Sequence, residues 1–396
     1  MVSLAPDEMR KERDAYRVMV VDDSAVIRGL IARWLDADPR ITVVATAHNG
    51  LMALRNLKSS GAEVVILDVE MPEMDGMTAL PKMIELVPNL QVIMASTLTR
   101  RNAEISLRAL AAGAADYVPK PSTSREVNNS AEFRREIIEK VKALGAVARN
   151  LANPAVHEPA PIEPAKPLHP AADGAAAVRP VALAPLPAGA PRRGPIRLQK
   201  ISSVLPRILA IGSSTGGPQA LFELFKGLKA APDLPVLITQ HMPPTFTAIL
   251  ADHIARATGI PCKEAADGDV LKAGQIYIAP GDYHLKVEEQ EGHVVARIDQ
   301  APPENFCRPA VDPMLRSVAR VYGPATLAVI LTGMGNDGME GCRRVIQAGG
   351  TVLAQDEQSS VVWGMPGAVA TAGLASAVLP LRDIAPMIQR LVRGGR

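Results

Sequence analysis

The sequence lacks the features that mark secreted, membrane-spanning and nucleic-acid-binding proteins. It has only three cysteines, Cys262, Cys307 and Cys342, without a CxxC spacing. Neither a disulfide framework nor a zinc cluster is therefore indicated, and a reducing compartment fits best. Its 43 Lys and Arg residues are balanced by 41 Asp and Glu residues, which argues against bulk electrostatic binding to nucleic acid. No apolar run approaches the ~20 residues that cross a membrane, and Met1 to Arg17 lacks the apolar stretch of a signal peptide. We expect a cytoplasmic protein with no direct membrane insertion.

The chain also has no repeat of the 20 to 50 residues that would indicate a solenoid or propeller. Its 396 residues predict two or three domains at roughly 100 to 200 residues each. Eleven of the 34 prolines fall between Pro154 and Pro195, and residues 152–195 are more than half Ala plus Pro. Such a composition favours extended, unpacked chain. We therefore expect a first domain at residues 15–140, a Pro/Ala-rich linker at 145–203 and a second domain at 204–396.

The first domain alternates short unbroken apolar runs with segments of helical periodicity. This pattern is typical of a parallel sheet that is buried on both faces and connected by crossover helices. We predict an α/β doubly wound domain with five parallel strands, and four of these strands can be located at Val18 to Val21, Val64 to Leu67, Val92 to Ala95 and Tyr117 to Val118.

The second domain shows the same pattern with one different element. Residues His284 to Val287 and His293 to Ile298 flank a turn and predict an antiparallel hairpin. We expect a mostly parallel α/β domain with an antiparallel edge, its parallel strands lying at Ile208 to Ile211, Val236 to Thr239, Leu327 to Leu331 and Thr351 to Ala354.

Charged and hydroxyl side chains end the apolar runs of the first domain. Ligands of open parallel sheets lie beyond the carboxyl ends of the strands, so these residues would meet in one crevice: Asp22, Asp23, Asp68, Ser96 and Lys120. Clustered carboxylates repel one another unless a cation lies among them, and Mg²⁺ favours such oxygen ligands. Beside Mg²⁺ and Lys120, Asp68 could attack a phosphoryl group and become an aspartyl phosphate. A single aspartate after a strand is more often a cap, but five such positions together indicate a site for a divalent metal and phosphorylation.

The motifs at these positions resemble the receiver domain of bacterial two-component response regulators. The resemblance covers residues 17–121 and rests on Val20-Val21-Asp22-Asp23-Ser24, Leu67-Asp68-Val69-Glu70-Met71-Pro72 and Lys120-Pro121. It implies that Asp68 accepts phosphate from a histidine kinase and that Asp22, Asp23 and Asp68 hold Mg²⁺. It further implies that Lys120 contacts the phosphate, that Ser96 is the switch hydroxyl and that the Lys120–Pro121 peptide is cis.

The second domain contains the string Gly212-Ser213-Ser214-Thr215-Gly216-Gly217, which fits G-x-S-x-G with Ser214 at its centre. The motif follows a predicted strand and precedes a predicted helix, as a nucleophile elbow requires. The absence of G-x-G-x-x-G and of a Lys-Ser/Thr pair argues against a nucleotide loop, although a purely structural glycine turn stays open.

A serine nucleophile needs a base and an acid that orients the base. His241 is the one histidine that ends an apolar strand in the second domain. Two aspartates, Asp337 and Asp356, follow strands and could each supply the acid, and spacing alone does not decide between them.

These motifs resemble the protein-glutamate methylesterases of bacterial chemotaxis. The resemblance covers about residues 205–390 and rests on the serine motif, on Thr239-Gln240-His241-Met242-Pro243 and on Thr332-Gly333-Met334-Gly335-Asn336-Asp337-Gly338. It implies that Ser214 is the nucleophile, His241 the general base and Asp337 the orienting acid. It also implies that the backbone N–H of Met334 stabilises the oxyanion. The start of the predicted helix directs a second backbone N–H, that of Thr215, at the same point.

The sequence therefore predicts a phosphorylation-activated hydrolase that cleaves glutamate methyl esters on chemoreceptors and, by the same resemblance, deamidates their glutamines. We expect the receiver to cover the edge that bears Ser214 until Asp68 is phosphorylated. No cofactor is expected in the second domain.

Three other classes of function are weighed against this interpretation. A DNA-binding output would need a helix-turn-helix with clustered basic residues, but residues 205–390 show strands and glycine turns instead. The second class is a catalytically silent module that docks on receptors or on a histidine kinase. The third is a serine hydrolase that acts on a small-molecule ester.

Overall fold

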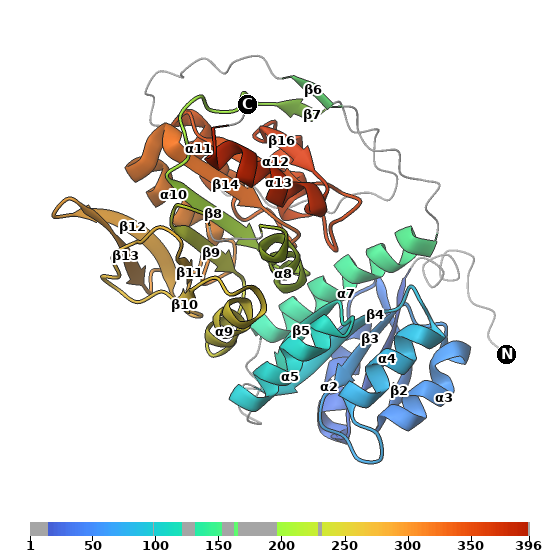
Figure 1. Cartoon of the computed structure of the whole chain (residues 1–396). Helices are drawn as coiled ribbons and strands as arrows, with labels where there is room; N and C mark the ends of the chain where they lie inside the picture. The colour runs from blue at the N-terminus through green and yellow to red at the C-terminus, as the bar shows by residue number, and fades with distance from the viewer. Residues whose placement is uncertain are drawn as a thin grey trace.

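A computed structural model describes residues 15–97, 99–120, 131–152, 162–164, 196–228 and 232–394. The described chain forms two α/β units that lie side by side, one before and one after the Pro/Ala-rich segment (Figure 1). The Lys120–Pro121 peptide and most of the expected linker lie outside the described residues.

The first unit is a five-stranded, fully parallel sheet in the order β2-β1-β3-β4-β5, as the sequence predicts. The strand that the sequence left unlocated is β2, which occupies one edge. Its residues are only partly buried in the middle of the strand, so it lacks the unbroken apolar pattern of its neighbours. The strands are β1 Tyr16–Val21, β2 Ile41–Ala47, β3 Val64–Asp68, β4 Gln91–Thr97 and β5 Asp116–Lys120.

Helices cover both faces of this sheet. Ser24, Asn49, Asp75 and Thr99 begin four of them, because each side-chain oxygen accepts a hydrogen bond from a backbone N–H in the first turn. One face packs against α3 Gly50–Ser60, α4 Gly76–Leu86 and α5 Arg100–Ala111, and the other against α2 Ala25–Asp36 and α7 Ala131–Ala152.

Helix α7 is an integral part of the first unit. Ile137, Val141 and Leu144 are fully buried against the sheet, in one cluster with Val18 and Val20. The helix continues through residues 145–152, so the first part of the segment expected to be linker is helical.

The second unit is built on a seven-stranded parallel sheet in the order β10-β11-β9-β8-β14-β15-β16. The hairpin forms at the expected residues, as β12 His284–Gln290 and β13 His293–Asp299, but it is a separate two-stranded sheet. The expectation of an antiparallel edge is wrong, since the parallel strands β10 and β16 occupy the edges of the large sheet. The hairpin packs instead on helix α10 through β12, where the N–H of Val287 donates to Oγ of Ser317. The parallel strands are β8 Ile208–Ser213, β9 Val236–Gln240, β10 Cys262–Glu264, β11 Ile276–Ile278, β14 Thr326–Ile330, β15 Thr351–Gln355 and β16 Ala377–Leu379.

Six α-helices of the described chain flank the second sheet. One face carries α8 Gly217–Gly227, α9 Phe246–Thr258 and α13 Leu381–Val392, and the other carries α10 Val311–Tyr322, α11 Met339–Gln347 and α12 Met365–Thr371. A 3₁₀ turn at Gly323–Ala325 precedes β14, and the short strands β6 Ile162–Pro164 and β7 Ile196–Leu198 pair with each other.

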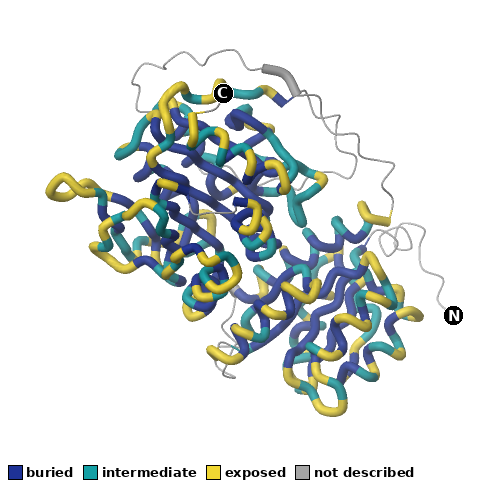
Figure 2. The backbone as a smooth tube through the Cα atoms, viewed as in Figure 1, coloured by how far each residue is buried: buried dark blue, intermediate teal, exposed yellow. Residues whose placement is uncertain are grey.

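The two units share a continuous buried core. Helix α5 of the first unit packs against α8 and α9 of the second, and one hydrophobic cluster extends across the junction. Figure 2 shows buried backbone on both sides of this junction, while exposed residues lie on the outer loops and helix faces. The amide of Gln219 on α8 donates to the carbonyl of Ala114, 2.9 Å away. The junction is thus packed as a domain interior is.

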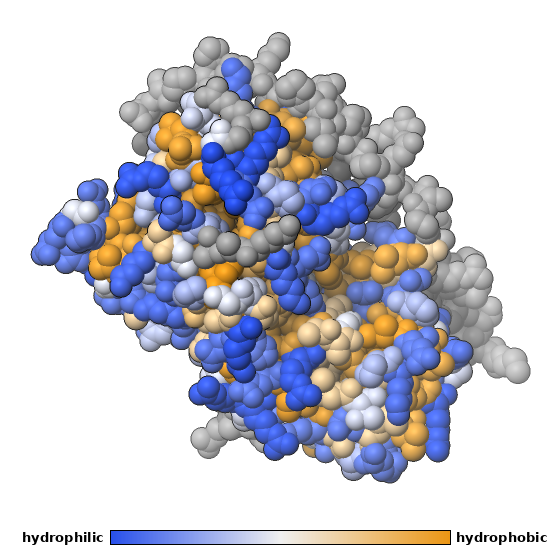
Figure 3. All heavy atoms as spheres, viewed as in Figure 1, coloured by the Kyte–Doolittle hydropathy of each residue, from blue (hydrophilic) through white to orange (hydrophobic). Residues whose placement is uncertain are grey.

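Hydrophilic side chains are interspersed with hydrophobic ones over the face of the molecule drawn in Figure 3. Within the described ranges, no helix combines the length and the apolar character needed to span a bilayer.

Candidate active site and phosphorylation site

The carboxyl ends of β1, β3 and β5 bring the predicted acidic cluster together. Nζ of Lys120 lies 2.6 Å from Oδ1 of Asp68 and 2.9 Å from Oδ2 of Asp22. Asp22 and Asp68 are buried, and Asp23 is exposed beside them. One carboxylate oxygen from each of the three aspartates lies within 4.8 Å of the others. Such a set of oxygens suits a hard divalent cation, and Mg²⁺ fits it.

Burial raises the pKa of Asp68 to about 6, against the opposing effect of Lys120. The neighbouring carboxylate of Asp22 raises it further, so a second cation at the cluster would favour the ionised form of Asp68. Ser96 is the penultimate residue of β4 at the same sheet edge, and its Oγ lies 2.9 Å from Oγ of Ser106 on α5. The hydroxyl is therefore engaged with α5 in this state.

The three predicted residues of the second unit also meet at one sheet edge. Ser214 follows β8, His241 follows β9 and Asp337 follows β14, and these three strands are neighbours in the order β9-β8-β14. The His241 N–H donates to the carbonyl of Ser213 at 3.1 Å, which ties the base to the strand that bears the serine.

The turn at Ser214 requires small residues. A Cβ on Gly217 would lie 2.0 Å from Oε1 of Gln240, so any larger residue there would displace the Gln240 amide from its hydrogen bonds to Ser213 and Ser214. A Cβ on Gly333 would lie 3.0 Å from the backbone nitrogen of Ser214, which shows how closely the loop after β14 approaches the serine. The half-buried Met334 is the next residue of that loop.

His241 and Asp337 form a tight buried pair. Nε2 of His241 lies 2.7 Å from Oδ2 of Asp337, and the aspartate side chain is 2% exposed. The same carboxylate accepts the N–H groups of Val311 and Asp312, at 2.6 and 3.1 Å, at the N-terminus of α10. Burial opposes ionisation, but the hydrogen bonds from His241 and from the backbone hold the pKa of Asp337 below its ordinary value. A carboxylate only accepts hydrogen bonds, so Nε2 carries a proton.

The other aspartate considered from the sequence has a local role. Oδ1 of Asp356 accepts the N–H of Ser359 at 2.9 Å and its hydroxyl at 2.6 Å, which closes the turn after β15. The geometry therefore pairs the histidine with Asp337.

Two residues that the sequence did not single out complete the surroundings of the triad. Nδ2 of Asn305 donates to Asp337 Oδ1 at 3.0 Å and to Asp312 Oδ2 at 2.9 Å, so it bridges two buried carboxylates. Burial and the nearby charge of Asp337 raise the pKa of Asp312 to about 6. Sγ of Cys307 lies 3.4 Å from Nδ1 of His241. Both Asn305 and Cys307 lie on a loop without a periodic pattern, and only folding brings them to the site.

The two nitrogens of His241 thus have partners, whereas Oγ of Ser214 has no hydrogen bond among the residues that the structure describes. Burial disfavours the imidazolium, but Cys307 and Asp337 outweigh it and raise the pKa of His241 to about 10.

The first unit contacts the residue next to the candidate nucleophile. Oγ1 of Thr215 donates to Oδ2 of Asp116 on β5 at 2.7 Å, and both side chains are buried. Lys140 of α7 lies 3.1 Å from the same carboxylate and donates to the carbonyl of Tyr117 at 2.6 Å. Burial opposes the charge of Lys140, but Asp116 and Glu136 outweigh it and raise its pKa. Strand β5 therefore bears Lys120 at one end and the Thr215 contact at the other.

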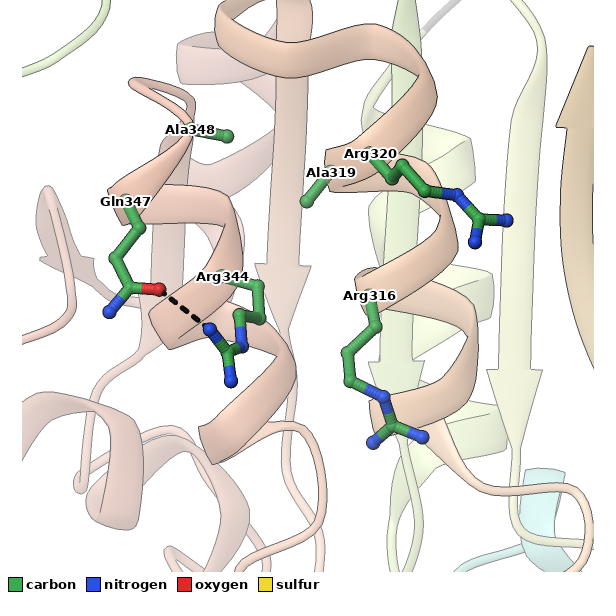
Figure 4. A pocket seen from close by; sticks show the side chains of 6 residues that line it. All are labelled: Arg316, Ala319, Arg320, Arg344, Gln347 and Ala348. Atoms are coloured by element: carbon green, nitrogen blue, oxygen red, sulfur yellow. Dashed lines mark hydrogen bonds between the residues drawn. The ribbon is translucent and has the colours of Figure 1, made fainter. Parts of the chain in front are cut away.

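A shallow pocket lies between α10 and α11, and it does not include the triad. Figure 4 shows Arg316 and Arg320 on one side and Arg344 and Gln347 on the other, with Arg344 donating to Gln347 at 3.2 Å. Arg316 is also paired with Glu304, at 2.6 Å.

Comparison with known proteins assigns each unit to a family. Residues 18–132 match the response regulator receiver domain family, and residues 209–388 match the CheB methylesterase family. A protein-glutamate methylesterase/protein-glutamine glutaminase of Rhodospirillum centenum is 52% identical, with 96% of this chain and 94% of that protein aligned. A protein of the same name from Azospirillum brasilense is 53% identical, with 95% and 93% aligned.

Among solved structures, the Thermotoga maritima CheB methylesterase catalytic domain is 45% identical, with a TM-score of 0.46, and covers 48% of this chain and 100% of its own. The response regulator domain of Thermotoga maritima CheB is 34% identical, with a TM-score of 0.31, and covers 33% of this chain and 97% of its own. Because the full-length relatives are about half identical over nearly their whole length, this chain belongs to the family of protein-glutamate methylesterases/protein-glutamine glutaminases that join a response regulator receiver domain to a CheB methylesterase domain.

Proposed function

We propose that this protein hydrolyses γ-glutamyl methyl esters on chemoreceptors, releases methanol, and deamidates receptor glutamines through the same tetrahedral chemistry. Membership of the methylesterase family supports the reaction. The observation that carries the assignment of residues is the 2.7 Å contact of His241 with Asp337, at the edge of the sheet that bears Ser214.

The geometry supports a division of roles within the triad. Because Nε2 of His241 donates to Asp337, the lone pair of Nδ1 is the base that takes the proton of Ser214. Oγ would then bond to the ester carbonyl carbon, and the proton on His241 would pass to the departing methoxide. His241 next takes a proton from water, whose oxygen attacks the acyl-enzyme and regenerates Ser214. Asp337 stabilises the imidazolium in both halves.

The oxyanion of each tetrahedral intermediate needs hydrogen-bond donors close to Ser214. The backbone N–H groups of Thr215 and Met334 are our candidates. Thr215 begins the turn into α8, and the loop that bears Met334 packs against the backbone of Ser214 through Gly333. Donors fixed in advance at this point would stabilise the charge as it develops.

Phosphorylation of Asp68 by a histidine kinase is the proposed input. Asp22, Asp23 and Asp68 would hold Mg²⁺, which would offset the charge on the transferring phosphoryl oxygens. Lys120 would contact the phosphate, and Ser96 would exchange Ser106 for it. These changes would bias the packing of β5 and α5, which touch the catalytic domain.

The test is methanol release from methylated receptor fragments, with and without a small-molecule phosphodonor and Mg²⁺. Release should be lost in Ser214→Ala and should fall by several orders of magnitude in Asp337→Asn, whereas the matched variant Asp356→Asn should retain it. Release that rises with phosphodonor would support both the reaction and its regulation by phosphorylation. Serine-dependent release without such a rise would contradict regulation by phosphorylation, and no release would favour a silent docking module.

A further inference from the structure

In the proposed triad, the nitrogen of His241 that should meet Ser214 is in contact with another residue, Cys307. With Nε2 donating to Asp337, Nδ1 is the nitrogen that must accept the serine proton. In this state Nδ1 faces Sγ of Cys307 at 3.4 Å, within hydrogen-bonding distance for sulfur. Oγ of Ser214 makes no hydrogen bond in the described part of the chain. The thiol and the serine hydroxyl are therefore alternative partners of one nitrogen.

The loop that bears Cys307 is held in a defined shape. Glu304 and Cys307 exchange two backbone hydrogen bonds, at 2.8 and 3.2 Å, and close a tight turn. Asn305 and Phe306 at its tip have φ values of 51° and 64°, a left-handed conformation that asparagine tolerates but that a bulky residue such as Phe306 adopts only when its surroundings impose it. Asn305 is fixed by Asp312 and Asp337. Cys307 is thus set against the imidazole by a rigid turn.

The tip of the same turn contacts the receiver. The guanidinium of Arg135, on α7, lies 4.1 Å from the centre of the Phe306 ring, and Phe306 is 73% exposed with this contact in place. A cation over an aromatic face is attracted to it. Because α7 packs on the receiver sheet, a movement of the receiver would change this contact. The turn therefore touches the base on one side and the regulatory domain on the other.

We propose that Cys307 is a positioning residue that caps the general base in the receiver-docked state, by occupying Nδ1 of His241 and keeping it from Ser214. The inference rests on the proposed roles of Ser214 and His241. Whether the proton between Cys307 and His241 lies on Sγ or on Nδ1, the hydrogen bond between them keeps Nδ1 from accepting the proton of Ser214. Undocking of the receiver releases Phe306 from Arg135, which lets the turn relax and the imidazole exchange Cys307 for Ser214.

The test is the rate at which Ser214 of the full-length protein reacts with a fluorophosphonate probe, with and without phosphodonor and Mg²⁺. In this reaction the Oγ–P bond forms, the P–F bond breaks, and His241 takes the serine proton. The rate therefore reports how readily His241 activates Ser214, and it does not require a chemoreceptor to bind. The variants are Cys307→Ala, Cys307→Ser and the matched control Cys262→Ala, whose half-buried thiol lies on β10 at the edge of the sheet.

For Cys307→Ala we expect the rate without phosphodonor to rise roughly two- to tenfold, as for the loss of one hydrogen bond, and the response to phosphodonor to shrink by the same factor. Cys307→Ser keeps a donor and should lie between Cys307→Ala and the unaltered protein. Cys262→Ala should leave both rates unchanged. Phe306→Ala, which removes the Arg135 contact but keeps the thiol, should raise the unstimulated rate in the same direction.

A Cys307→Ala rate that is unchanged, or that falls equally with and without phosphodonor, would overturn the capping role. Failure of the unaltered protein to label at Ser214 in either state would instead overturn the proposed function, and the inference with it.

Discussion

Tyr117 of the receiver lies flat against Phe246 of the catalytic domain, with ring centroids 4.6 Å apart and ring planes 9° from parallel. Tyr117 is 4% exposed and Phe246 fully buried. Phe246 begins α9, five residues after His241, and Tyr117 comes directly after the aspartate that bonds to Thr215. The stacked rings and the hydrogen bond between Asp116 and Thr215 therefore join the two domains at adjacent residues of β5.

Replacement of Tyr117 by alanine should loosen the junction between the domains. Aromatic pairs contribute roughly 0.5–1.5 kcal/mol beyond the area they bury, so we expect Tyr117→Ala to raise methanol release without phosphodonor several-fold. Tyr117→Phe keeps the ring and is the matched control. Equal unstimulated rates in the two variants would show that the stack does not hold the docked state.

The hydroxyl of Thr215 offers a second way to weaken docking without touching the backbone N–H. Thr215→Val removes the hydrogen bond to Asp116 and leaves that carboxylate paired with Lys140. Hydrogen bonds to charged groups contribute roughly 1.5–3 kcal/mol, so the unstimulated rate should rise by about tenfold or more. The rate with phosphodonor should change much less. Thr258→Val, on the far end of α9, is the control, and a loss of both rates would argue for a role of the hydroxyl in catalysis.

Asn305 should matter for the reaction itself. Asn305→Ala removes the amide that bridges Asp337 and Asp312, so the repulsion between these buried carboxylates is no longer offset. We expect kcat to fall roughly tenfold or more, with little change in KM, because the orientation of the base is disturbed and not the docking of substrate. The exposed Asn89→Ala serves for comparison. A change confined to KM would point to substrate contact instead.

The pH dependence of activity should reveal the raised pKa of His241 in contact with Cys307. Only neutral His241 can accept the serine proton, and in the docked state its pKa is raised from 6.5 to about 10. The rate without phosphodonor should therefore rise with pH well beyond 6.5, and Cys307→Ala should move the midpoint downward, since one of the two groups that raise the pKa is gone. Asp312 and the Glu304–Arg316 pair face the same site and are unchanged in this variant. An unmoved midpoint would contradict the assignment.

The raised pKa of His241 also affects the stability of the fold, which should fall with rising pH where the reaction rate rises. A raised folded-state pKa means that protonated His241 stabilises the fold fully below its unfolded value of 6.5. That contribution is lost as the pH rises from 6.5 through about 10. The difference in unfolding free energy between the unaltered protein and His241→Ala, measured with denaturant, should narrow across this window.

Phosphorylation should depend on a divalent cation through Asp23. Asp23→Ala removes the exposed member of the acidic cluster and leaves the Lys120 contacts of Asp22 and Asp68 intact. Incorporation of phosphate from a small-molecule donor should drop roughly tenfold or more, as it should after chelation of Mg²⁺. Ser214→Ala should incorporate phosphate normally. Undiminished labelling of Asp23→Ala would remove this residue from the metal site.

Site residues at the ends of strands could be predicted from the sequence, whereas those on loops could not. Asp22, Asp68, Lys120 and His241 end buried apolar runs, so their convergence at a sheet edge could be foreseen from the strand pattern. The edge strand β2 was not located because partial burial disrupts its apolar run. Cys307 and Asn305 were missed because they lie on an aperiodic turn that only folding brings against His241 and Asp337. Spacing alone left Asp337 and Asp356 open, the family resemblance implied Asp337, and the structure pairs His241 with Asp337.

Strand β5 spans only five residues, Asp116 to Lys120, which at about 3.3 Å per residue is a length of roughly 13 Å. Its last residue, Lys120, lies at Asp68, the proposed phosphate acceptor, and its first, Asp116, bonds to Thr215, next to the proposed nucleophile. A single short strand therefore links the proposed phosphorylation site to the surroundings of Ser214. The path along β5 from Asp68 to the catalytic domain is therefore short, and within this strand uncoupling variants should cluster at Lys120 and at Asp116 and Tyr117, where β5 meets the catalytic domain.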